Sequence, residues 1–501
     1  MDNEKQLIGV RKQKLQKIKE LNVNPFPNRV VRTEKIKNLW NNKDEFIKEA
    51  KEVTIAGRLR ALRRMGKVGF GDIEDDSGRI QIFVKQNAVG KENYNIFKLF
   101  DLGDFMQITG ECFETNRGEY SIRAKSVKML GKNLKPIPTV KEKTVDGKKV
   151  RYDEFSDIEL RYRKRYLDIM LNPDVKDTFT KRALIMKTIR KFLDESEFLE
   201  VETPILQPIY GGANANPFVT HHNKLNMELY LRIATELYLK RLIIGGFEKV
   251  YEIGKNFRNE GMDKLHNPEF TAIEIYQAYA DYEDMMKLTE DMLVTISKKI
   301  FGKEEFSYQG KTISLQRPWR RASMLDLIKK ETGSDFSDFN FEEIKKFCLD
   351  NDIEVTSDSN AGKLIEAIFS EFVEPKLMQP TFVTDFPKEV SPLAKSNPDN
   401  PKLVERFEVF IAGNEYGNAF TELNDPIDQR QRLEAQAKMR ELGDEEANVV
   451  DEDFIEALEY GMPPTGGLGL GLDRLVMLFT DNTSIKEVIF FPQMRPENSN
   501  D

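Results

Sequence analysis

An acid and a phenol share one side of a predicted strand at residues 270–279. Glu274 and Tyr276 are two positions apart, and Ile273 and Ile275 occupy the alternate positions. Successive side chains of a strand point to opposite faces of a sheet, so the isoleucines must pack against helices. Glu274 and Tyr276 therefore project from the open face, where they could bind a polar ligand.

Two further predicted strands carry polar side chains at alternate positions. A single strand with one polar face is typical of a sheet that has one side exposed to solvent. Three such strands, with aromatic residues between the polar ones, indicate that this side of the sheet forms the base of a binding site. The polar positions are Glu252, Asn256, Arg258 and Glu260 in and just after the segment 249–259, and Asn418 and Glu422 in the segment 418–423.

A glycine-rich stretch, GGLGLGLDRLVMLF, starts at Gly466 and leads through Arg474 into a predicted helix. We interpret it as a turn in which glycines let a ligand approach the backbone, and amides at a helix N-terminus favour phosphate. Packing of a strand against a helix would also explain the glycines. The stretch is neither a P-loop nor the start of a βαβ unit, so a nucleotide site here would be of another kind.

Histidine and cysteine are scarce. The three histidines are His221, His222 and His266, and the two cysteines are Cys112 and Cys348. Two cysteines exclude a disulfide framework and a cysteine-rich zinc site. A three-histidine metal site or a Ser-His-Asp hydrolase is disfavoured, because no Gly-x-Ser-x-Gly elbow accompanies the histidines.

The sequence before these strands predicts a region of the chain that binds nucleic acid. Residues 1–70 contain 18 Lys and Arg against 8 Asp and Glu, although the whole chain of 501 residues has a net charge of -8. Residues 1–52 are expected to be a basic helical extension with a helix at 3–21. Residues 53–135 contain five short alternating segments, turn signals at 76–78 and 116–118, and a helical insert before the fourth strand. This pattern fits a five-stranded OB-type barrel, a fold that binds oligonucleotides.

A larger α+β domain is expected after a linker at 136–165. It would cover 166–501, with an amphipathic helix at 175–195, antiparallel strand pairs and a mainly helical cover or insertion at 284–375. Strands joined by such short connections must be antiparallel. The fold class is thus α+β, with a barrel followed by an antiparallel sheet flanked by helices.

A membrane location is not expected. No apolar run approaches the roughly 18 residues that a membrane span needs. The segment 1–21 is rich in lysine and has no apolar stretch of the secretory type, so we expect a cytoplasmic protein.

Several segments resemble motifs of the class II aminoacyl-tRNA synthetases. FRNEG at 257–261 with HNPEF at 266–270 resembles motif 2, GLGLGLDRL at 467–475 resembles motif 3, and FLEVETPIL at 198–206 resembles motif 1. The barrel is similar to the anticodon-binding domain of the subclass that charges lysine, aspartate and asparagine. Longer segments, such as ERFEVFIAGNEYGNAFTELND, closely resemble bacterial-type lysyl-tRNA synthetases.

This resemblance implies an enzyme that uses ATP to activate L-lysine as lysyl-adenylate and transfers the lysyl group to the 3′ end of tRNA(Lys). It also implies a homodimer formed through motif 1, and Mg2+ as the cofactor. The catalytic residues would be Arg258 and Arg474. The ATP-binding residues would be Arg258, Glu260, His266, Asn267, Phe270 and Arg474.

The remaining roles also follow from the resemblance. Glu408 and Glu415 would bind the metal, and because they are seven residues apart, Gly413 must lie in a turn that returns Glu415 to the site. Phe70 and Gln81 would stack on and read anticodon bases. The lysine-binding residues would be Gly212, Glu236, Glu274, Tyr276, Asn418 and Glu422.

The charge of this pocket agrees with the implied substrate. A buried ammonium group needs hydrogen-bonded negative partners, because burial costs several kcal/mol per ion without them. Glu274, Glu422 and the Tyr276 hydroxyl would serve the ε-ammonium group, and Glu236 the α-ammonium group, whereas an aspartate pocket would need arginine and lysine. Two alternatives are a lysyl-transferring enzyme that modifies a protein, whose relatives lack the barrel, and a non-catalytic protein that binds single-stranded nucleic acid.

Overall fold

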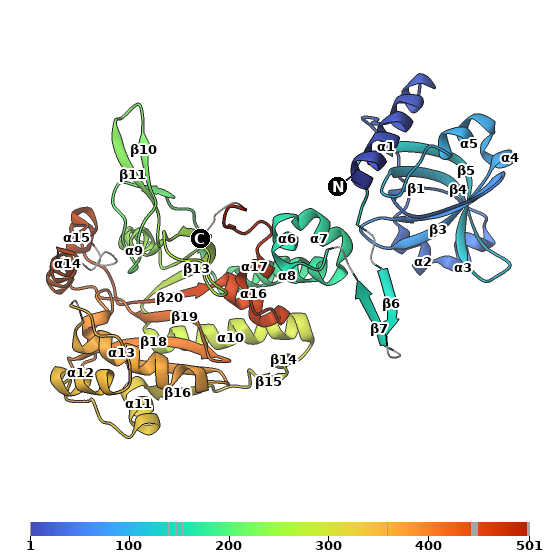
Figure 1. Ribbon diagram of the computed structural model, residues 1–501. Coiled ribbons are helices and arrows are strands. Elements are labelled where there is room, and N and C mark those ends of the chain that lie inside the picture. Colours follow the sequence, from blue (N-terminus) through green and yellow to red (C-terminus); the bar gives the residue numbers. More distant parts are fainter. Residues whose placement is uncertain are drawn as a thin grey trace. The chain divides into compact units, whose positions relative to one another are not determined.

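The chain forms two compact units, Met1–Asp157 and Ile158–Asp501 (Figure 1). The computed structural model describes residues 2–138, 141–145, 148–152, 155–357, 359–441 and 449–497. The boundary between the units falls within the segment that we expected to be a linker. Among the described residues, no helix has the length and apolar character needed to cross a membrane.

The first unit is a closed five-stranded barrel with the strand order β1-β2-β3-β5-β4, which confirms the predicted OB-type fold. The two turn signals connect β2 to β3 and β4 to β5. The helical insert before the fourth strand is also present, as α4 and α5. The elements are β1 Glu52–Met65, β2 Val68–Glu74, β3 Arg79–Lys85, α4 Gln86–Val89, α5 Lys91–Phe97, β4 Phe105–Glu114 and β5 Tyr120–Gly131.

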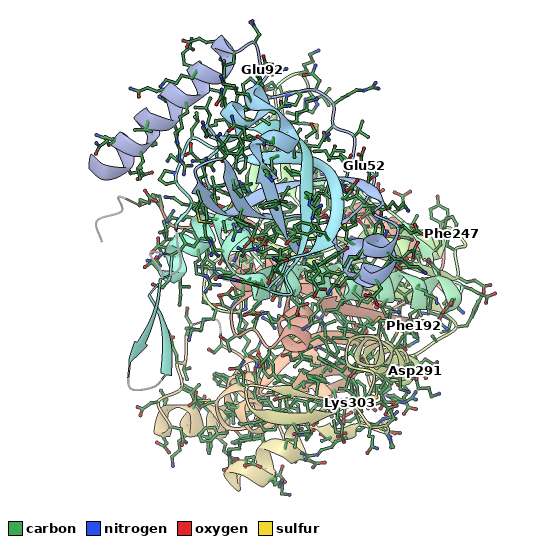
Figure 2. The ribbon with its side chains drawn as sticks, turned by 90° about the vertical axis from the view of Figure 1, so that its right-hand side faces the viewer. Glu52, Glu92, Phe192, Phe247, Asp291 and Lys303 are labelled. Atoms are coloured by element: carbon green, nitrogen blue, oxygen red, sulfur yellow. The ribbon has the colours of Figure 1, made fainter. Side chains whose placement is uncertain are left out.

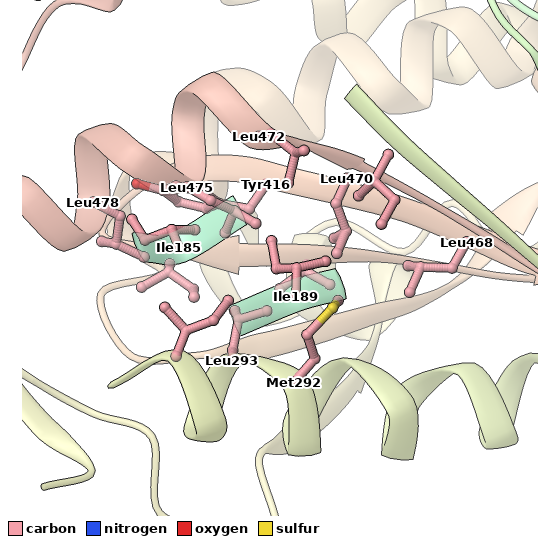
Figure 3. Packing of buried hydrophobic residues seen from close by; sticks show 14 of the residues in the cluster. Ile185, Ile189, Met292, Leu293, Tyr416, Leu468, Leu470, Leu472, Leu475 and Leu478 are labelled. Atoms are coloured by element: carbon pink, nitrogen blue, oxygen red, sulfur yellow. The ribbon is translucent and has the colours of Figure 1, made fainter. Parts of the chain in front are cut away.

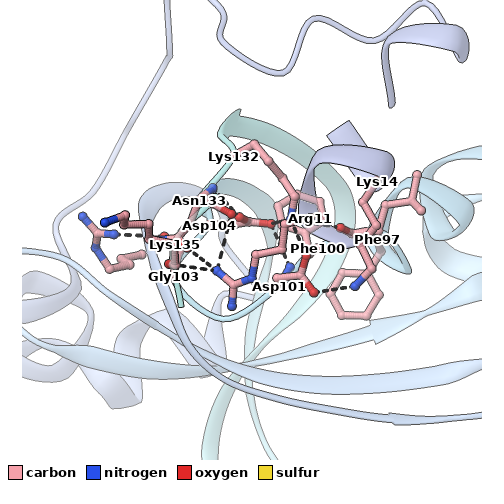
Figure 4. A network of polar contacts seen from close by, with 12 residues as sticks. Arg11, Lys14, Phe97, Phe100, Asp101, Gly103, Asp104, Lys132, Asn133 and Lys135 are labelled. Atoms are coloured by element: carbon pink, nitrogen blue, oxygen red, sulfur yellow. Dashed lines mark hydrogen bonds and ion pairs between the residues drawn. The ribbon is translucent and has the colours of Figure 1, made fainter. Parts of the chain in front are cut away.

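The N-terminal helices pack on the barrel and share its core. Ile18 of α1 and Leu39 of α2 are fully buried with the barrel's apolar residues. A polar network, drawn in Figure 4, connects the same parts: the Lys132 ammonium lies 2.6 Å from Asp101 and 2.8 Å from Asp104, and Lys14 of α1 also pairs with Asp101. The helices are α1 Asp2–Glu20, α2 Ile36–Asn41 and α3 Lys43–Lys48.

The segment expected to be a linker contains regular structure. A hairpin of β6 Lys141–Val145 and β7 Lys148–Tyr152 lies within it, followed by α6 Ile158–Arg163 at the start of the second unit. The two strands contain the β-branched residues Thr144, Val145 and Val150 and the aromatic Tyr152, and these residue types favour strand structure.

The second unit is built on an eight-stranded sheet with the order β16-β17-β18-β19-β20-β13-β12-β8. The expected hairpins β12–β13 and β18–β19 are confirmed as antiparallel. The sheet is mixed, however, because β8 joins β12 and β16 joins β17 in parallel. The strands are β8 Leu199–Glu200, β12 Lys249–Phe257, β13 Glu269–Ala278, β16 Arg320–Ser323, β17 Thr381–Pro387, β18 Leu403–Ile411, β19 Asn414–Thr421 and β20 Thr465–Gly471.

Three helices cover one face of this sheet. Ile189 of α8, Leu293 of α10 and Leu475 of α16 pack with Leu468 and Leu470 of β20 in one buried cluster (Figure 3). The outer side of α10 is polar, and its Asp291, labelled in Figure 2, forms an ion pair with Arg317. The helices are α8 Pro173–Glu195, α10 Tyr282–Phe301 and α16 Leu472–Thr480.

The segment 284–375, expected to be mainly helical, also contains strands. Its helices after α10 pack in a separate apolar cluster, but β16 extends the edge of the main sheet, so the segment is not simply a cover. Its elements after α10 are β14 Glu305–Tyr308, β15 Lys311–Ser314, β16, α11 Met324–Thr332, α12 Phe341–Asp350, α13 Ala361–Phe372 and η1 Glu374–Lys376.

The segment 198–206, which resembles motif 1, reads as a strand that runs into Pro204, but little of it has strand geometry. Only Leu199–Glu200 and Leu206–Gln207, the latter as β9, have strand geometry, because Pro204 between them cannot donate to a strand ladder. The remaining elements of the second unit are α7 Arg165–Leu171, β10 Val219–His222, β11 Met227–Leu231, α9 Glu236–Ile244, η2 Lys388–Val390, α14 Pro426–Glu441, α15 Glu452–Glu459 and α17 Ile485–Val488.

Candidate active site

A cavity of about 390 Å³ lies on the sheet face opposite α8, α10 and α16. Strand parity explains its lining: Ile273 and Ile275 of β13 are buried among those helices, whereas Glu274 and Tyr276 face the cavity. The structure therefore brings the polar sides of β12, β13 and β19 together, as the sequence pattern predicted. Glu252 of β12 is the exception, because it pairs with Arg232 and does not line the cavity.

The glycine-rich stretch is a strand and not the turn that we expected. In β20, Leu468 and Leu470 point into the helix-covered core, so Gly467 and Gly469 face the cavity between β13 and β19. A Cβ atom on Gly467 would lie 1.9 Å from Oε1 of Glu422 and 2.7 Å from the Tyr276 ring. Glycine is therefore required at this position to make room for the two side chains.

A β-bulge brings Glu415 to the cavity. Val409 pairs with Gly417 and Phe410 pairs with Glu415, so Tyr416 is an extra residue in β19. The extra residue reverses the alternation, and Tyr416 is buried in the core while Glu415 lines the cavity beside Asn418. Gly413 lies in the connecting turn with a φ of +73°, as expected, but the bulge is the feature that reverses the direction of Glu415.

Three carboxylates meet at one end of the cavity, on Glu236, Glu274 and Glu422, and all three are buried. Oε1 of Glu274 accepts a hydrogen bond from the Thr235 amide at 2.9 Å, and its Oε2 accepts one from the Tyr276 hydroxyl at 3.2 Å. Burial, and then the nearby Glu236, raise the pKa of Glu274 to about 7.

Lys240 partly compensates this negative charge. Its Nζ atom donates to Oε1 of Glu236 at 2.6 Å and forms an ion pair with Glu422. Burial still raises the pKa of both Glu236 and Glu422, against the opposing effect of Lys240. Beyond that ion pair, the Glu422 carboxylate has no hydrogen-bond partner among the described residues. The pocket therefore has an excess of negative charge that a cationic ligand would relieve.

Gly212 lies against this cluster. It has a φ of +87°, and a Cβ atom there would lie 3.0 Å from Cβ of Glu236. The segment around Gly212 thus approaches the pocket closely because the residue has no side chain.

The other end of the cavity carries cations and an aromatic ring. The Arg258 guanidinium lies 5.2 Å from the centre of the Phe270 ring, and the Arg258 Nε atom has no partner among the described residues. Asn267 is buried, and its Oδ1 atom also lacks a partner there. Because buried polar atoms are normally hydrogen-bonded, these orphaned atoms indicate a polar ligand. Glu260 lines the same end and is exposed.

Arg474 and His266 lie together at this end. Nη1 of Arg474 donates to the Glu415 carbonyl at 2.9 Å and lies 3.2 Å from its Oε2 atom. Nη2 of Arg474 is 3.0 Å from Nε2 of His266, and the other ring nitrogen of His266 is 2.8 Å from Asp263. Arg474 can reach an anion at this end, while Glu415 and His266 hold the side chain in place.

Glu408 and Glu415 form a pair of carboxylates in the cavity lining, and Glu415 contacts Arg474. Arg406 donates to Oε1 of Glu408 at 2.6 Å. Burial raises the pKa of Glu408 to about 8 against the effect of Arg406, and the charges of Glu415 and Glu366 add to the increase. Among the described residues, no three or more His, Cys, Asp or Glu side chains are grouped so that they could hold a metal ion by themselves. Two carboxylates nevertheless fit Mg2+, which commonly takes one or two of them together with phosphate oxygens and water.

Two site residues were missed at the level of the sequence. Lys240 is four residues after Glu236, and this spacing places both side chains on one face of α9. Arg406 is two residues before Glu408, on the same side of β18, and its Nε atom donates to Oδ1 of Asn418 at 2.9 Å. Both spacings are visible in the sequence, but no sequence pattern predicts that these two cationic side chains lie at the site.

The predicted anticodon residues lie on the barrel, in the other unit. Phe70 of β2 packs at 4.9 Å from Phe83 of β3, and Phe83 packs at 6.0 Å from Phe113 of β4. Gln81 accepts a hydrogen bond from the Ser121 hydroxyl at 3.0 Å. Phe83 and Phe113 were not singled out from the sequence, although they alternate with buried residues as Phe70 does.

Comparison with known proteins agrees with this geometry. Residues 157–495 match the family described as tRNA synthetases class II (D, K and N), and residues 53–130 match the OB-fold nucleic acid binding domain. The chain therefore belongs to the class II tRNA synthetases of the D, K and N group.

Its relatives narrow the family further. Lysine–tRNA ligase of Clostridium novyi is 52% identical over 98% of this chain and 94% of its own length. Lysine–tRNA ligases of Carboxydothermus hydrogenoformans and Bacillus subtilis are 49% and 48% identical, over 98% and 97% of this chain and 99% and 97% of their own lengths. Within the class II group, the chain is a member of the lysine–tRNA ligase family.

The geometry of β20 generates a first prediction. Gly467→Ala should lower the free energy of unfolding by about 1–3 kcal/mol, because its Cβ would overlap the buried Glu422 carboxylate. Gly469→Ala is the matched control in the same strand, since its Cβ would meet no atom closer than 3.8 Å. Urea unfolding of both variants measures the difference, and equal losses would contradict the assigned role of Gly467.

Proposed function

We propose that the chain activates L-lysine with ATP to form lysyl-adenylate and then transfers the lysyl group to the 3′ end of tRNA(Lys). The observation that carries this proposal is the group of buried carboxylates on Glu236, Glu274 and Glu422, which exceeds the charge of Lys240. Lysine has two ammonium groups and can relieve that excess. An aspartate substrate would add negative charge to the same pocket, so we reject that alternative.

The lysine site in this proposal extends along the carboxylate end of the cavity. Glu236 accepts hydrogen bonds from the α-ammonium group, and Glu274 and Glu422 face the ε-ammonium group. The Tyr276 hydroxyl, which donates to Glu274, keeps that carboxylate oriented. The remaining lysine contacts come from Asn418, held by Arg406, and from the backbone around Gly212.

ATP occupies the cationic end. The adenine ring stacks on Phe270, and Glu260, His266 and Asn267 contact the nucleotide. Arg258 binds both the substrate carboxylate and the α-phosphate, and Arg474 binds the terminal phosphates. The two catalytic arginines thus neutralise the negative charge that the phosphates bring to the site.

The first step needs no general base, because the lysine carboxylate is ionised at neutral pH. A carboxylate oxygen attacks the α-phosphorus, the bond from the α-phosphorus to the bridging oxygen breaks, and pyrophosphate leaves. Arg258 stabilises the charge that develops on the α-phosphate, and the pocket holds the reactants in line. In the second step the terminal ribose hydroxyl of tRNA attacks the carbonyl carbon, the bond from that carbon to the phosphate oxygen breaks, and AMP leaves with release of the hydroxyl proton.

Glu408 and Glu415 would hold Mg2+ in this scheme. When bound, Mg2+ neutralises phosphate charge and helps to orient the polyphosphate. Arg406 keeps Glu408 in position, and the bulge at Tyr416 keeps Glu415 beside it.

The barrel is proposed to bind the anticodon of tRNA(Lys). Phe70 would stack on a base, and Gln81 would read a base edge through its amide. The barrel also argues against an enzyme that modifies a protein, since such relatives lack it. The basic residues among the first 70 suit a polyanion, and we propose that the enzyme works in the cytoplasm.

We further propose a homodimer formed through residues 175–206. Leu199, Ile205 and Leu206 in this segment are each more than two-fifths exposed, which is unusual for neighbouring large apolar residues. Most soluble homo-oligomers are twofold, and a twofold axis would let this segment meet its own copy. Light scattering should give a dimer mass, and a fully active monomer at nanomolar concentration would refute the proposal.

The lysine pocket gives a kinetic prediction. Glu422→Gln removes a buried charge opposite the ε-ammonium group, so kcat/KM for lysine in pyrophosphate exchange should fall roughly thirtyfold to several thousandfold. The KM for ATP should change far less. Glu405→Gln in the neighbouring strand, outside the cavity lining, is the control. A variant that raised the ATP KM and left lysine unaffected would contradict the assignment of Glu422.

The division into two units gives another prediction. A chain that starts at Ile158 should keep lysine-dependent pyrophosphate exchange, because every residue proposed to contact lysine or ATP lies in the second unit. It should lose tRNA charging at ordinary concentrations, because the barrel is missing. Circular dichroism must show that the shortened chain is folded. Charging at the full-length rate by the folded chain would contradict the role given to the barrel.

A further inference from the structure

Lys240 is enclosed behind the wall of the cavity. Its side chain is fully buried, and it is not among the residues that line the cavity. Its ammonium group pairs with Glu236 of α9 and with Glu422 at the end of β19, and lies 5.4 Å from the Phe420 ring and 5.9 Å from the Phe454 ring. The group therefore acts on the ligand only through its two carboxylate partners.

The charges around Lys240 leave two unmatched negative charges. When all three are ionised, Glu236, Glu274 and Glu422 supply three negative charges, and Lys240 supplies one positive charge. Two neutral groups beside them, the Thr235 amide and the Tyr276 hydroxyl, both donate to Glu274. Arg406 of β18 acts on Glu236 from a greater distance. The two ammonium groups of L-lysine would make this part of the pocket neutral.

We propose that Lys240 is a positioning and specificity-determining residue, which sets the charge of the pocket so that it is matched by a substrate with two ammonium groups. The inference rests on the proposed assignment of Glu236, Glu274 and Glu422 to lysine. Unpaired buried charges are costly, so an amino acid with a single ammonium group would leave one carboxylate uncompensated. Without Lys240, L-lysine itself would leave one uncompensated, and that carboxylate would take up a proton instead.

The test is the KM for L-lysine in pyrophosphate exchange. Lys240→Met should raise it roughly thirtyfold or more, because two buried carboxylates lose their charged partner. Relative to the unmodified enzyme, the KM of Lys240→Met should rise as pH rises from about 7 to 9, because the lysine-bound state then needs the extra proton in place of the Lys240 charge. Lys240→Arg keeps the charge and should lose less than Lys240→Met.

A double variant separates charge matching from a structural role. Lys240→Met with Glu236→Gln restores a net of two negative charges, so its lysine KM should be lower than that of Lys240→Met alone. If Lys240 only filled space or held α9, the second substitution would raise the lysine KM further, because it would also remove the proposed contact of Glu236 with the α-ammonium group. A double variant worse than Lys240→Met would therefore overturn the proposal.

The chain also offers a matched control for loss of a buried lysine. Lys132 in the barrel is fully buried between Asp101 and Asp104 (Figure 4). Lys132→Met should lower stability and leave the lysine KM and its pH dependence unchanged. If the unmodified enzyme failed to exchange pyrophosphate with L-lysine, the proposed function would fail. If the unmodified enzyme exchanged pyrophosphate with L-lysine, but Lys240→Met had the same lysine KM and pH profile as that enzyme, only this inference would be wrong.

Discussion

The burial of several like charges in one pocket is the constraint on which the second unit depends. Glu236, Glu274 and Glu422 come from a helix and two strands, and Lys240 offsets only part of their charge. Such a group is costly in a protein interior without partners, and burial raises the pKa of each carboxylate. The sheet and its covering helices must be rigid enough to hold it, and the large apolar core on the opposite face provides that rigidity.

Small backbone features place the charged groups within this frame. Gly467 leaves room for Glu422, the bulge at Tyr416 directs Glu415 to the cavity, and the positive φ of Gly212 lets another segment approach Glu236. Each feature changes where a side chain points without changing the order of the strands. The geometry of the site thus depends on local departures from regular strand structure, while the fold depends on regular alternation.

The two units use a buried lysine for different purposes. Lys132 lies between Asp101 and Asp104 and connects the strands of the barrel to the neighbouring loop, with Lys14 of the first helix attached to the same group. In that group two lysines balance two aspartates. The carboxylates around Lys240 outnumber it, and we propose that a cationic ligand supplies the missing positive charge.

Alternation and motif spacing in the sequence determined the barrel, the two hairpins of the main sheet, the sides on which Glu274, Tyr276 and Glu422 lie, and the membership of the family. These properties are local, since strand parity and turn chemistry operate over a few residues. The alternation of glycine and leucine in β20 also indicates a strand, so the prediction of a turn there was wrong. Only the tertiary structure decided that Lys240 and Arg406 join the site, that a bulge directs Glu415, and that β8 and β16 complete the sheet in parallel. Those outcomes depend on which residues distant in the chain become neighbours and how far they are buried, and no local pattern in the sequence specifies either.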